Sequence, residues 1–191
     1  MGEHRLIAGK NTAYEEDIRV PLILRGPGVP EGARIGAMAL NIDLAPTFAE
    51  IAGVAPPAFV DGRSLLPLLD DPQQPWRHAF LIERRQLEEH FIKYAERHGV
   101  SAEELHRHAY LDGLRTARWT YVEYGSGERE LYDLAADPHQ LDNRIERAEP
   151  ELVAALAWRL GELAGCAGQS CRDLEDLPLG DRQLQPAAVR R

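Results

Sequence analysis

In the second half of the chain, three short strand-like segments are followed by one amphipathic helical segment, and this order limits the possible folds. Residues 110–118, 119–124 and 130–134 are short and strand-like, and Gly125-Ser126-Gly127 between the last two is typical of a hairpin turn. Pro150 then stands in the first turn of a predicted helix. Its apolar face is a stripe of leucines: Leu152, Leu156, Leu160 and Leu163. We therefore expect a small antiparallel sheet packed on a C-terminal helix.

The first half mixes strand and helix signals. Residues 18–24 are a short apolar run closed by a Gly-Pro turn, which predicts a buried strand, and residues 33–42 can form a second strand. Asp43 has the position of an N-cap for a helix that runs to about Ala52, with Gly53 just past its end. Residues 54–77 hold too many prolines for a long regular element, so they mark the best boundary between two packed units.

The segments on either side of the predicted sheet are also assigned by pattern. Residues 79–83 predict a strand, residues 86–98 a helix, and the capping box at residues 101–104 a further helix. After Cys171 the chain has no clear period, and we expect a frayed tail.

The composition excludes several classes of partner. The 22 basic and 31 acidic residues leave a net charge of −9, which repels a phosphate backbone, so no nucleic acid is expected. No apolar run approaches the roughly 18 residues that a membrane span requires, so no membrane partner is expected. The first residues carry no apolar segment of the kind found in export signals.

Candidate metal and redox sites are few. His106 and His108 point to different faces of a predicted helix, which favours a solvated surface over a zinc site. Residues 133–143 are rich in carboxylates but lack the Gly and Glu of a calcium loop, so they predict a structural turn and no metal site. Cys166 and Cys171 suit a small surface disulfide, which would imply an oxidising compartment; free thiols are the alternative.

The N-terminal segment is the most informative candidate site. Its Gly-punctuated loop leads directly into the predicted strand at residues 18–24, and ligands often lie at loops beside strand ends. It gathers charged and polar side chains: His4, Lys10, Tyr14, Glu15, Glu16, Asp17 and Arg19. A solvated charged loop without a ligand is the alternative.

Four blocks of sequence carry a resemblance to a known family. Residues 2–22, with Gly9-Lys10-Asn11-Thr12-Ala13-Tyr14-Glu15, resemble the second signature of the type I sulfatases, Gly-Lys-x-x-x-Tyr-Glu followed by a basic residue and Pro. Residues 41–47 resemble the family's next helix, and residues 61–65 its Asp-Gly-x-Ser-Leu turn. Residues 115–143 match its C-terminal hairpin and turn. The sequence is thus identified as the C-terminal portion of a type I sulfatase, similar to arylsulfatases and N-acetylglucosamine-6-sulfatases.

The resemblance implies a fold and a domain order. It implies an α/β protein, the C-terminal part of an alkaline-phosphatase-like (sulfatase) fold, with a small antiparallel sheet packed on a C-terminal helix. Residues 1–70 would be the end of the α/β catalytic domain, residues 71–165 the C-terminal subdomain, and residues 166–191 a Cys-containing tail. The Cys pair and the family together suggest a periplasmic or extracellular protein.

The resemblance also implies an activity and its site. Intact sulfatases hydrolyse sulfate esters with a formylglycine nucleophile and a calcium ion. By resemblance, Lys10 would bind a sulfate oxygen of the substrate and assist catalysis, and His4 is a weaker candidate for substrate binding. Tyr14 and Glu15 would fix the loop.

One departure limits this assignment. These residues contain no Cys/Ser-x-Pro-x-Arg motif to mature to formylglycine, and the calcium ligands of the family are not among them. We therefore expect the chain to be inactive alone and to need an N-terminal sulfatase half. A non-catalytic binding module, or a fragment of a phosphoesterase of the same superfamily, are the alternatives.

Overall fold

The structure, a computed structural model, describes residue 4, residues 12–85, residue 93, residues 97–99 and residues 110–179. It forms two compact units. Unit 1 contains Met1–Val20, Phe80–Ala164 and Leu179–Arg191, and unit 2 contains Pro21–Ala79 and Gly165–Pro178. Among the described residues, no helix combines the length and apolar character needed to cross a membrane.

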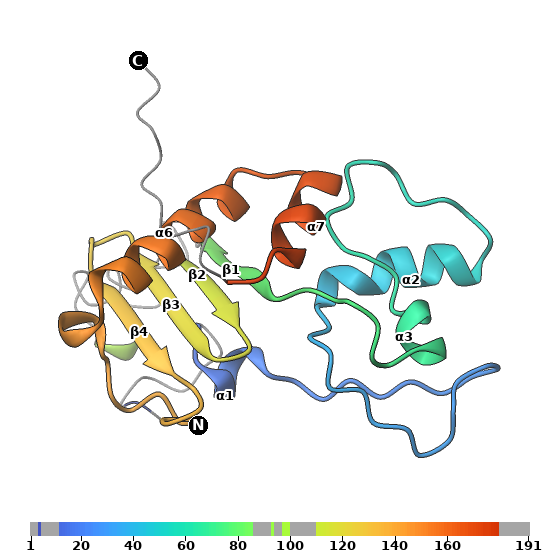
Figure 1. The fold of residues 1–191 in the computed structure, drawn as a ribbon, viewed down its shortest axis with the longest axis horizontal. Coiled ribbons are helices and arrows are strands. Elements are labelled where there is room, and N and C mark those ends of the chain that lie inside the picture. The colour runs from blue at the N-terminus through green and yellow to red at the C-terminus, as the bar shows by residue number, and fades with distance from the viewer. Residues whose placement is uncertain (1–3, 5–11, 86–92, 94–96, 100–109, 180–191) are drawn as a thin grey trace. The chain divides into compact units, whose positions relative to one another are not determined.

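Unit 1 is built on the antiparallel sheet expected from the sequence (Figure 1). Its strands are β1 (Ala79–Arg85), β2 (Tyr110–Thr116), β3 (Trp119–Tyr124) and β4 (Arg129–Asp133), in that spatial order. Both β2–β3 and β3–β4 are antiparallel, with Leu114 opposite Tyr121 and Val122 opposite Glu130. The prediction of a hairpin between β3 and β4 is therefore confirmed.

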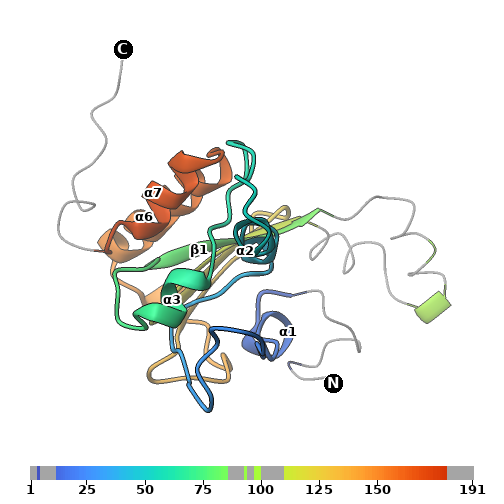
Figure 2. The ribbon, with the colours of Figure 1, turned by 90° about the vertical axis from the view of Figure 1, so that its right-hand side faces the viewer.

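Side chains alternate between the two faces of each strand, and both faces of the sheet in unit 1 are covered. Leu114, Tyr121 and Leu131 are fully buried on one face. Helix α6 (Pro150–Ala164) packs against β2 and buries part of its leucine stripe, as predicted. On the opposite face, Ala13 packs with Leu111, Val122 and Tyr124 just before the short helix α1 (Glu15–Ile18). Figure 2 shows α6 and α1 on opposite sides of the strands. A 3-10 turn, η3 (Ile145–Arg147), leads into α6.

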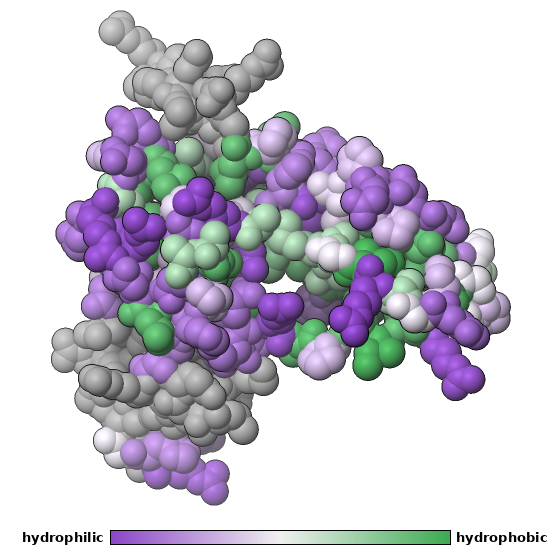
Figure 3. Space-filling view, turned by 60° about the horizontal axis from the view of Figure 1, so that its bottom comes forward, coloured by the Kyte–Doolittle hydropathy of each residue, from purple (hydrophilic) through white to green (hydrophobic). Residues whose placement is uncertain are grey.

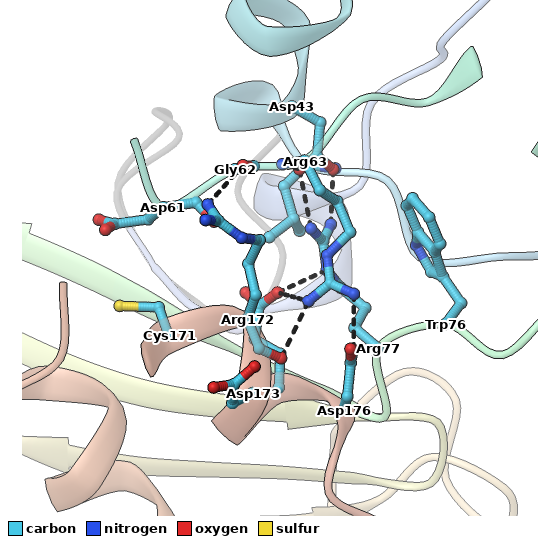
Figure 4. A network of polar contacts seen from close by, with 12 residues as sticks. Asp43, Asp61, Gly62, Arg63, Trp76, Arg77, Cys171, Arg172, Asp173 and Asp176 are labelled. Atoms are coloured by element: carbon cyan, nitrogen blue, oxygen red, sulfur yellow. Dashed lines mark hydrogen bonds and ion pairs between the residues drawn. The ribbon is translucent and has the colours of Figure 1, made fainter. Parts of the chain in front are cut away.

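Unit 2 has a charged interior rather than a large apolar one. Its elements are η2 (Asn41–Asp43), α2 (Leu44–Ile51), α3 (Leu66–Asp70) and α7 (Gln169–Asp176). Asp43, Arg77 and Glu175 are buried among them. Figure 4 shows the polar contacts around Asp43 and Arg77. The helix predicted after Asp43 is confirmed, with Gly53 beyond its end at a φ of 68°.

Arg77 is the centre of this network. Its guanidinium donates to both carboxylate oxygens of Asp43, at 2.5 and 2.8 Å, and to Glu175 Oε2 at 2.9 Å. Arg63 donates to the same Glu175 oxygen at 2.9 Å and to Asp176 at 2.6 Å. The network therefore joins α7 to the segment before α2, far away in sequence.

Asp43 is not the side-chain cap that its position predicted. It stands at the N-cap of α2 but makes no capping bond there. Its carboxylate instead accepts hydrogen bonds from the backbone of Leu40 at 2.8 Å and of Arg63 at 3.0 Å, besides those from Arg77. The Asp43 carboxylate thus binds Arg77 and the backbone of Leu40 and Arg63 instead of the first turn of α2.

The two predicted N-terminal strands are absent from the described part of the chain. Residues 18–24 end α1 and continue as irregular backbone, and residues 33–40 are irregular as well. Ile23, expected to be buried, is 88% exposed. A strand needs a hydrogen-bonding neighbour on at least one side, and no described segment pairs with these residues. The prediction of strands was therefore wrong for this chain by itself.

The prediction of a frayed tail directly after Cys171 was wrong for residues 172–176. Residues after Cys171 continue helix α7 up to Asp176, because Cys171 and Glu175 face the interior of unit 2. The helices predicted over residues 86–98 and from residue 101 fall largely or wholly outside the described residues. The division of the chain at residues 70 and 165 stays a prediction.

Candidate functional site

The signature segment is fixed to unit 1 directly after the position of Lys10. Lys10 itself lies outside the described residues, whereas His4 and residues 12–18 are described. Thr12 donates from its backbone N–H and its hydroxyl to Asp17 Oδ2, at 2.9 and 2.6 Å. The carbonyl of Tyr14 accepts from the N–H groups of Asp17 and Ile18, which closes the first turn of α1.

Tyr14 is anchored on the sheet through its hydroxyl. The side chain is buried, with 8% of the residue exposed, and its hydroxyl donates to Glu130 Oε1 at 3.2 Å. Tyr124 donates to the other oxygen of Glu130 at 3.0 Å. The edge of the Tyr132 ring meets the Tyr14 ring, with centroids 5.9 Å apart. Strands β3 and β4 thus bind Tyr14 through the Tyr132 ring and through the Glu130 carboxylate, which Tyr124 also contacts.

Glu15 is held by a second set of contacts from the same unit. Its carboxylate accepts from Arg115 Nε at 2.7 Å and from Nη2 at 3.2 Å, which is a bidentate ion pair. Its backbone N–H donates to the side-chain oxygen of buried Gln140 at 2.7 Å. These contacts agree with the structural role that we expected for Tyr14 and Glu15.

His4 lies flat against Tyr14. The two rings are stacked, with centroids 3.8 Å apart and planes 8° from parallel. Nε2 of His4 lies 3.6 Å from Glu16 Oε2, close enough for an ion pair when the imidazole is protonated. The position of His4 therefore depends on Tyr14 and Glu16, the residues at the start of α1.

Burial controls the electrostatics of this region. Burial raises the pKa of Glu130, and the hydrogen bonds from Tyr124 and Tyr14 oppose that rise without cancelling it. Burial, together with the nearby Glu130 carboxylate, raises the pKa of Tyr14 to about 12. The Tyr14 hydroxyl is therefore a hydrogen-bond donor at neutral pH.

The remaining candidates are the two cysteines, the two histidines and the carboxylate-rich segment at residues 133–143. The structure joins Cys166 and Cys171 in a disulfide, with Cα atoms 5.1 Å apart. His106 and His108 lie outside the described residues. Residues 133–143 form a turn in which Asp137 accepts hydrogen bonds from the backbone of residues 140 and 142. No group of three metal-binding side chains occurs among the residues that the structure describes.

Comparison with known proteins identifies the class. A family described as "N-sulphoglucosamine sulphohydrolase, C-terminal" matches residues 2–164. The N-acetylglucosamine-6-sulfatase of Bos taurus is 35% identical over 190 residues, covering 90% of this chain and 34% of the relative. An extracellular sulfatase SULF-1 homolog of Drosophila melanogaster is 44% identical over 87 residues, covering 44% of this chain and 8% of the relative.

A solved structure has the same fold. The structure of BT4656 in complex with its substrate, D-glucosamine-2-N,6-O-disulfate, superposes with a TM-score of 0.66 at 27% identity. The match covers 86% of this chain and 31% of that protein. The fold is therefore that of the C-terminal part of a sulfatase, within the alkaline-phosphatase-like class.

The chain belongs to the N-sulphoglucosamine sulphohydrolase C-terminal family, the C-terminal portion of the type I sulfatases. It spans about a third of the length of the N-acetylglucosamine-6-sulfatases that it matches.

Sequence reasoning missed two residues that shape this site. The sequence placed Glu130 and Arg115 in predicted strands and in the block that resembles the sulfatase hairpin, with no site role, although they hold Tyr14 and Glu15. No sequence signal singles out Glu130, which is half-buried in β4 beside the charged Arg129, with Asp133 at the end of the same strand. A carboxylate at such a position needs donors, and only the fold shows that one donor is Tyr14.

Proposed function

We propose that this chain is the C-terminal portion of a sulfuric ester hydrolase, and that Lys10 binds the sulfate group of the substrate with His4 beside it. The observation that carries the proposal is the anchoring of the signature segment. Thr12, Tyr14 and Glu15 are each held by named contacts, and Lys10 precedes Thr12 by two residues. A rigid base of this kind limits where a lysine side chain can reach.

The chemistry of Lys10 follows from its charge. A sulfate ester carries negative charge on its oxygens, and that charge is redistributed as the ester bond breaks. An ammonium group beside those oxygens stabilises both the bound substrate and the transition state. A protonated His4 would add a second cation to the proposed site.

The described residues do not fit the calcium site of the family. No three metal-binding side chains lie together among them, and the sequence contains no Cys/Ser-x-Pro-x-Arg motif for formylglycine. In the proposed assembly, both belong to an N-terminal sulfatase portion.

An exposed apolar surface on unit 2 supports such a partner. Phe48 and Ile51 of α2 are 62% and 65% exposed. Other exposed apolar side chains of unit 2 are Leu22, Ile23, Val54 and Phe59. Figure 3 shows hydrophobic side chains at the surface on the face drawn. The chain covers 34% of the matched N-acetylglucosamine-6-sulfatase, and a sulfatase N-terminal portion is the partner that we propose for this surface.

We further propose an oxidising compartment, periplasmic or extracellular, for the assembled protein. The Cys166–Cys171 disulfide supports this location, because such bonds persist outside reducing compartments.

The proposal is tested in an intact sulfatase that contains this chain. Lys10→Ala should lower kcat/KM about 100- to 1,000-fold, the usual cost of losing one charge-stabilising donor. Lys10→Arg should recover only part of the activity, since a planar guanidinium places its charge differently from an ammonium. His106→Ala and His108→Ala are the controls and should change little. Near-normal kcat/KM in Lys10→Ala would show that the loop is only a solvated charged segment.

A second test uses the purified 191-residue chain with an aryl sulfate. We expect no hydrolysis above a Lys10→Ala control, because these residues hold no formylglycine motif. Turnover that depends on Lys10 would contradict the need for an N-terminal portion.

A further inference from the structure

Glu130 is connected to the candidate site through two successive contacts. Its carboxylate accepts the hydroxyl of Tyr14 at 3.2 Å, and the ring of Tyr14 carries the imidazole of His4 at a centroid distance of 3.8 Å. Glu130 is 116 residues from Tyr14 in sequence. Strand β4 is therefore connected to His4 through the side chain of Tyr14.

The contacts of Glu130 differ from those of the neighbouring anchor. Glu15 is neutralised by Arg115, whereas the described hydrogen bonds of Glu130 come from the hydroxyls of Tyr14 and Tyr124. A partly buried carboxylate without a guanidinium partner is costly for stability alone. Its position is explained if it fixes the ring on which His4 rests.

We propose that Glu130 is a positioning residue of the sulfate-binding loop: it holds Tyr14 in place, and Tyr14 in turn holds His4. This inference rests on the proposed function for the importance of His4, but the positioning itself is independent of that role. Glu130 touches neither substrate nor reacting atoms in this proposal.

The sheet offers a matched control. Glu123 on β3 also accepts a hydrogen bond from a tyrosine hydroxyl, that of Tyr121, at 2.6 Å. Tyr121 belongs to the same strand, and among the described residues this hydrogen bond involves no residue of the N-terminal segment. Replacing Glu123 removes the same kind of contact without acting on His4.

The test is an NMR experiment on the 191-residue chain with labelled histidine, in which His4 is assigned by its loss in His4→Gln. A stacked Tyr14 ring shifts the His4 ring signals upfield, and Tyr14→Leu defines the loss of that shift. Glu130→Leu and Tyr14→Phe should each lose most of the shift, while Glu130→Gln, which keeps an acceptor for the hydroxyl, should retain most of it. Glu123→Leu should leave the shift unchanged.

The His4 shift in these variants distinguishes a positioning role of Glu130 from a purely structural one. If Glu130→Leu or Tyr14→Phe unfolds cooperatively and keeps the full His4 shift, the positioning role is overturned. If Glu130→Leu fails to fold, Tyr14→Phe decides, because it removes a single hydroxyl and keeps the ring. In an intact sulfatase, a lost His4 shift with unchanged kcat/KM would uphold the positioning and overturn the role of His4 in substrate binding.

Discussion

Arg77 and Asp43 form a fully buried bidentate ion pair in unit 2, with both side chains at 0% exposure. Glu175 accepts a further hydrogen bond from Arg77, so α7 depends on the same guanidinium. Two charges taken out of water are tolerated only when each satisfies the other, and removal of one leaves the other stranded.

The first prediction concerns this pair. Arg77→Met should destabilise unit 2 by about 3–5 kcal/mol, because it strands the Asp43 carboxylate in the interior. The free energy of unfolding from a denaturant titration measures the effect. Arg147→Ala is the control, since its partner Asp142 is exposed and surface pairs contribute about 1 kcal/mol or less. The double variant Asp43→Leu with Arg77→Met should recover much of the loss; equal losses for single and double variants would contradict the argument.

Gly62 provides a second prediction, on backbone packing. A Cβ atom at this position would lie 2.1 Å from the carbonyl oxygen of Ile42, so a larger residue must displace backbone. Gly62→Ala should therefore cost about 1–3 kcal/mol or more, as overpacking does in other interiors. Gly36→Ala is the matched control, because nothing lies within 4 Å of its Cβ position. The idea fails if the two variants have the same midpoint of unfolding.

The disulfide gives a third prediction. Cys166 and Cys171 are 5 residues apart, and closing so short a loop contributes about 2 kcal/mol by the chain-entropy estimate. The variant with both cysteines changed to serine should loosen the start of α7 in hydrogen exchange while unit 2 stays folded, since the Arg77–Glu175 contact remains. Intact-mass analysis after oxidising expression should show no alkylatable thiol; two free thiols would rule out the bridge.

A fourth prediction concerns pH and Glu130. Burial raises the pKa of Glu130 in the folded chain above its ordinary value of 4.5, despite the bonds from Tyr14 and Tyr124, with Tyr132 and His4 also nearby. The folded state then binds more protons than the unfolded state between the two pKa values, so stability falls as pH rises through that window. Glu130→Gln should remove this part of the slope of unfolding free energy against pH.

The control for the pH measurement is Leu141→Ala, which replaces an exposed side chain of unit 1 that does not titrate. It should keep the wild-type slope. A slope that Glu130→Gln leaves unchanged would mean that Glu130 binds its proton equally in the folded and unfolded chain.

The sequence by itself was sufficient for the local elements of the C-terminal half. The strand at residues 119–124, the glycine turn after it and the helix from Pro150 depend on period, turn residues and apolar spacing, all of which are local properties. The signature at residues 9–15 likewise identified the family, later shown by the match over residues 2–164.

Only the tertiary structure decided which side chains meet across long separations. Asp43 has the sequence position of a helix cap, yet Arg77, 34 residues later, determines what its carboxylate does. Glu130 looked like an ordinary strand residue until the fold brought Tyr14 to it. The apolar run at residues 18–24 predicted a strand, but a strand exists only when a neighbour supplies its hydrogen bonds. Period and propensity describe what a segment can become, whereas its actual state depends on partners that local sequence does not contain.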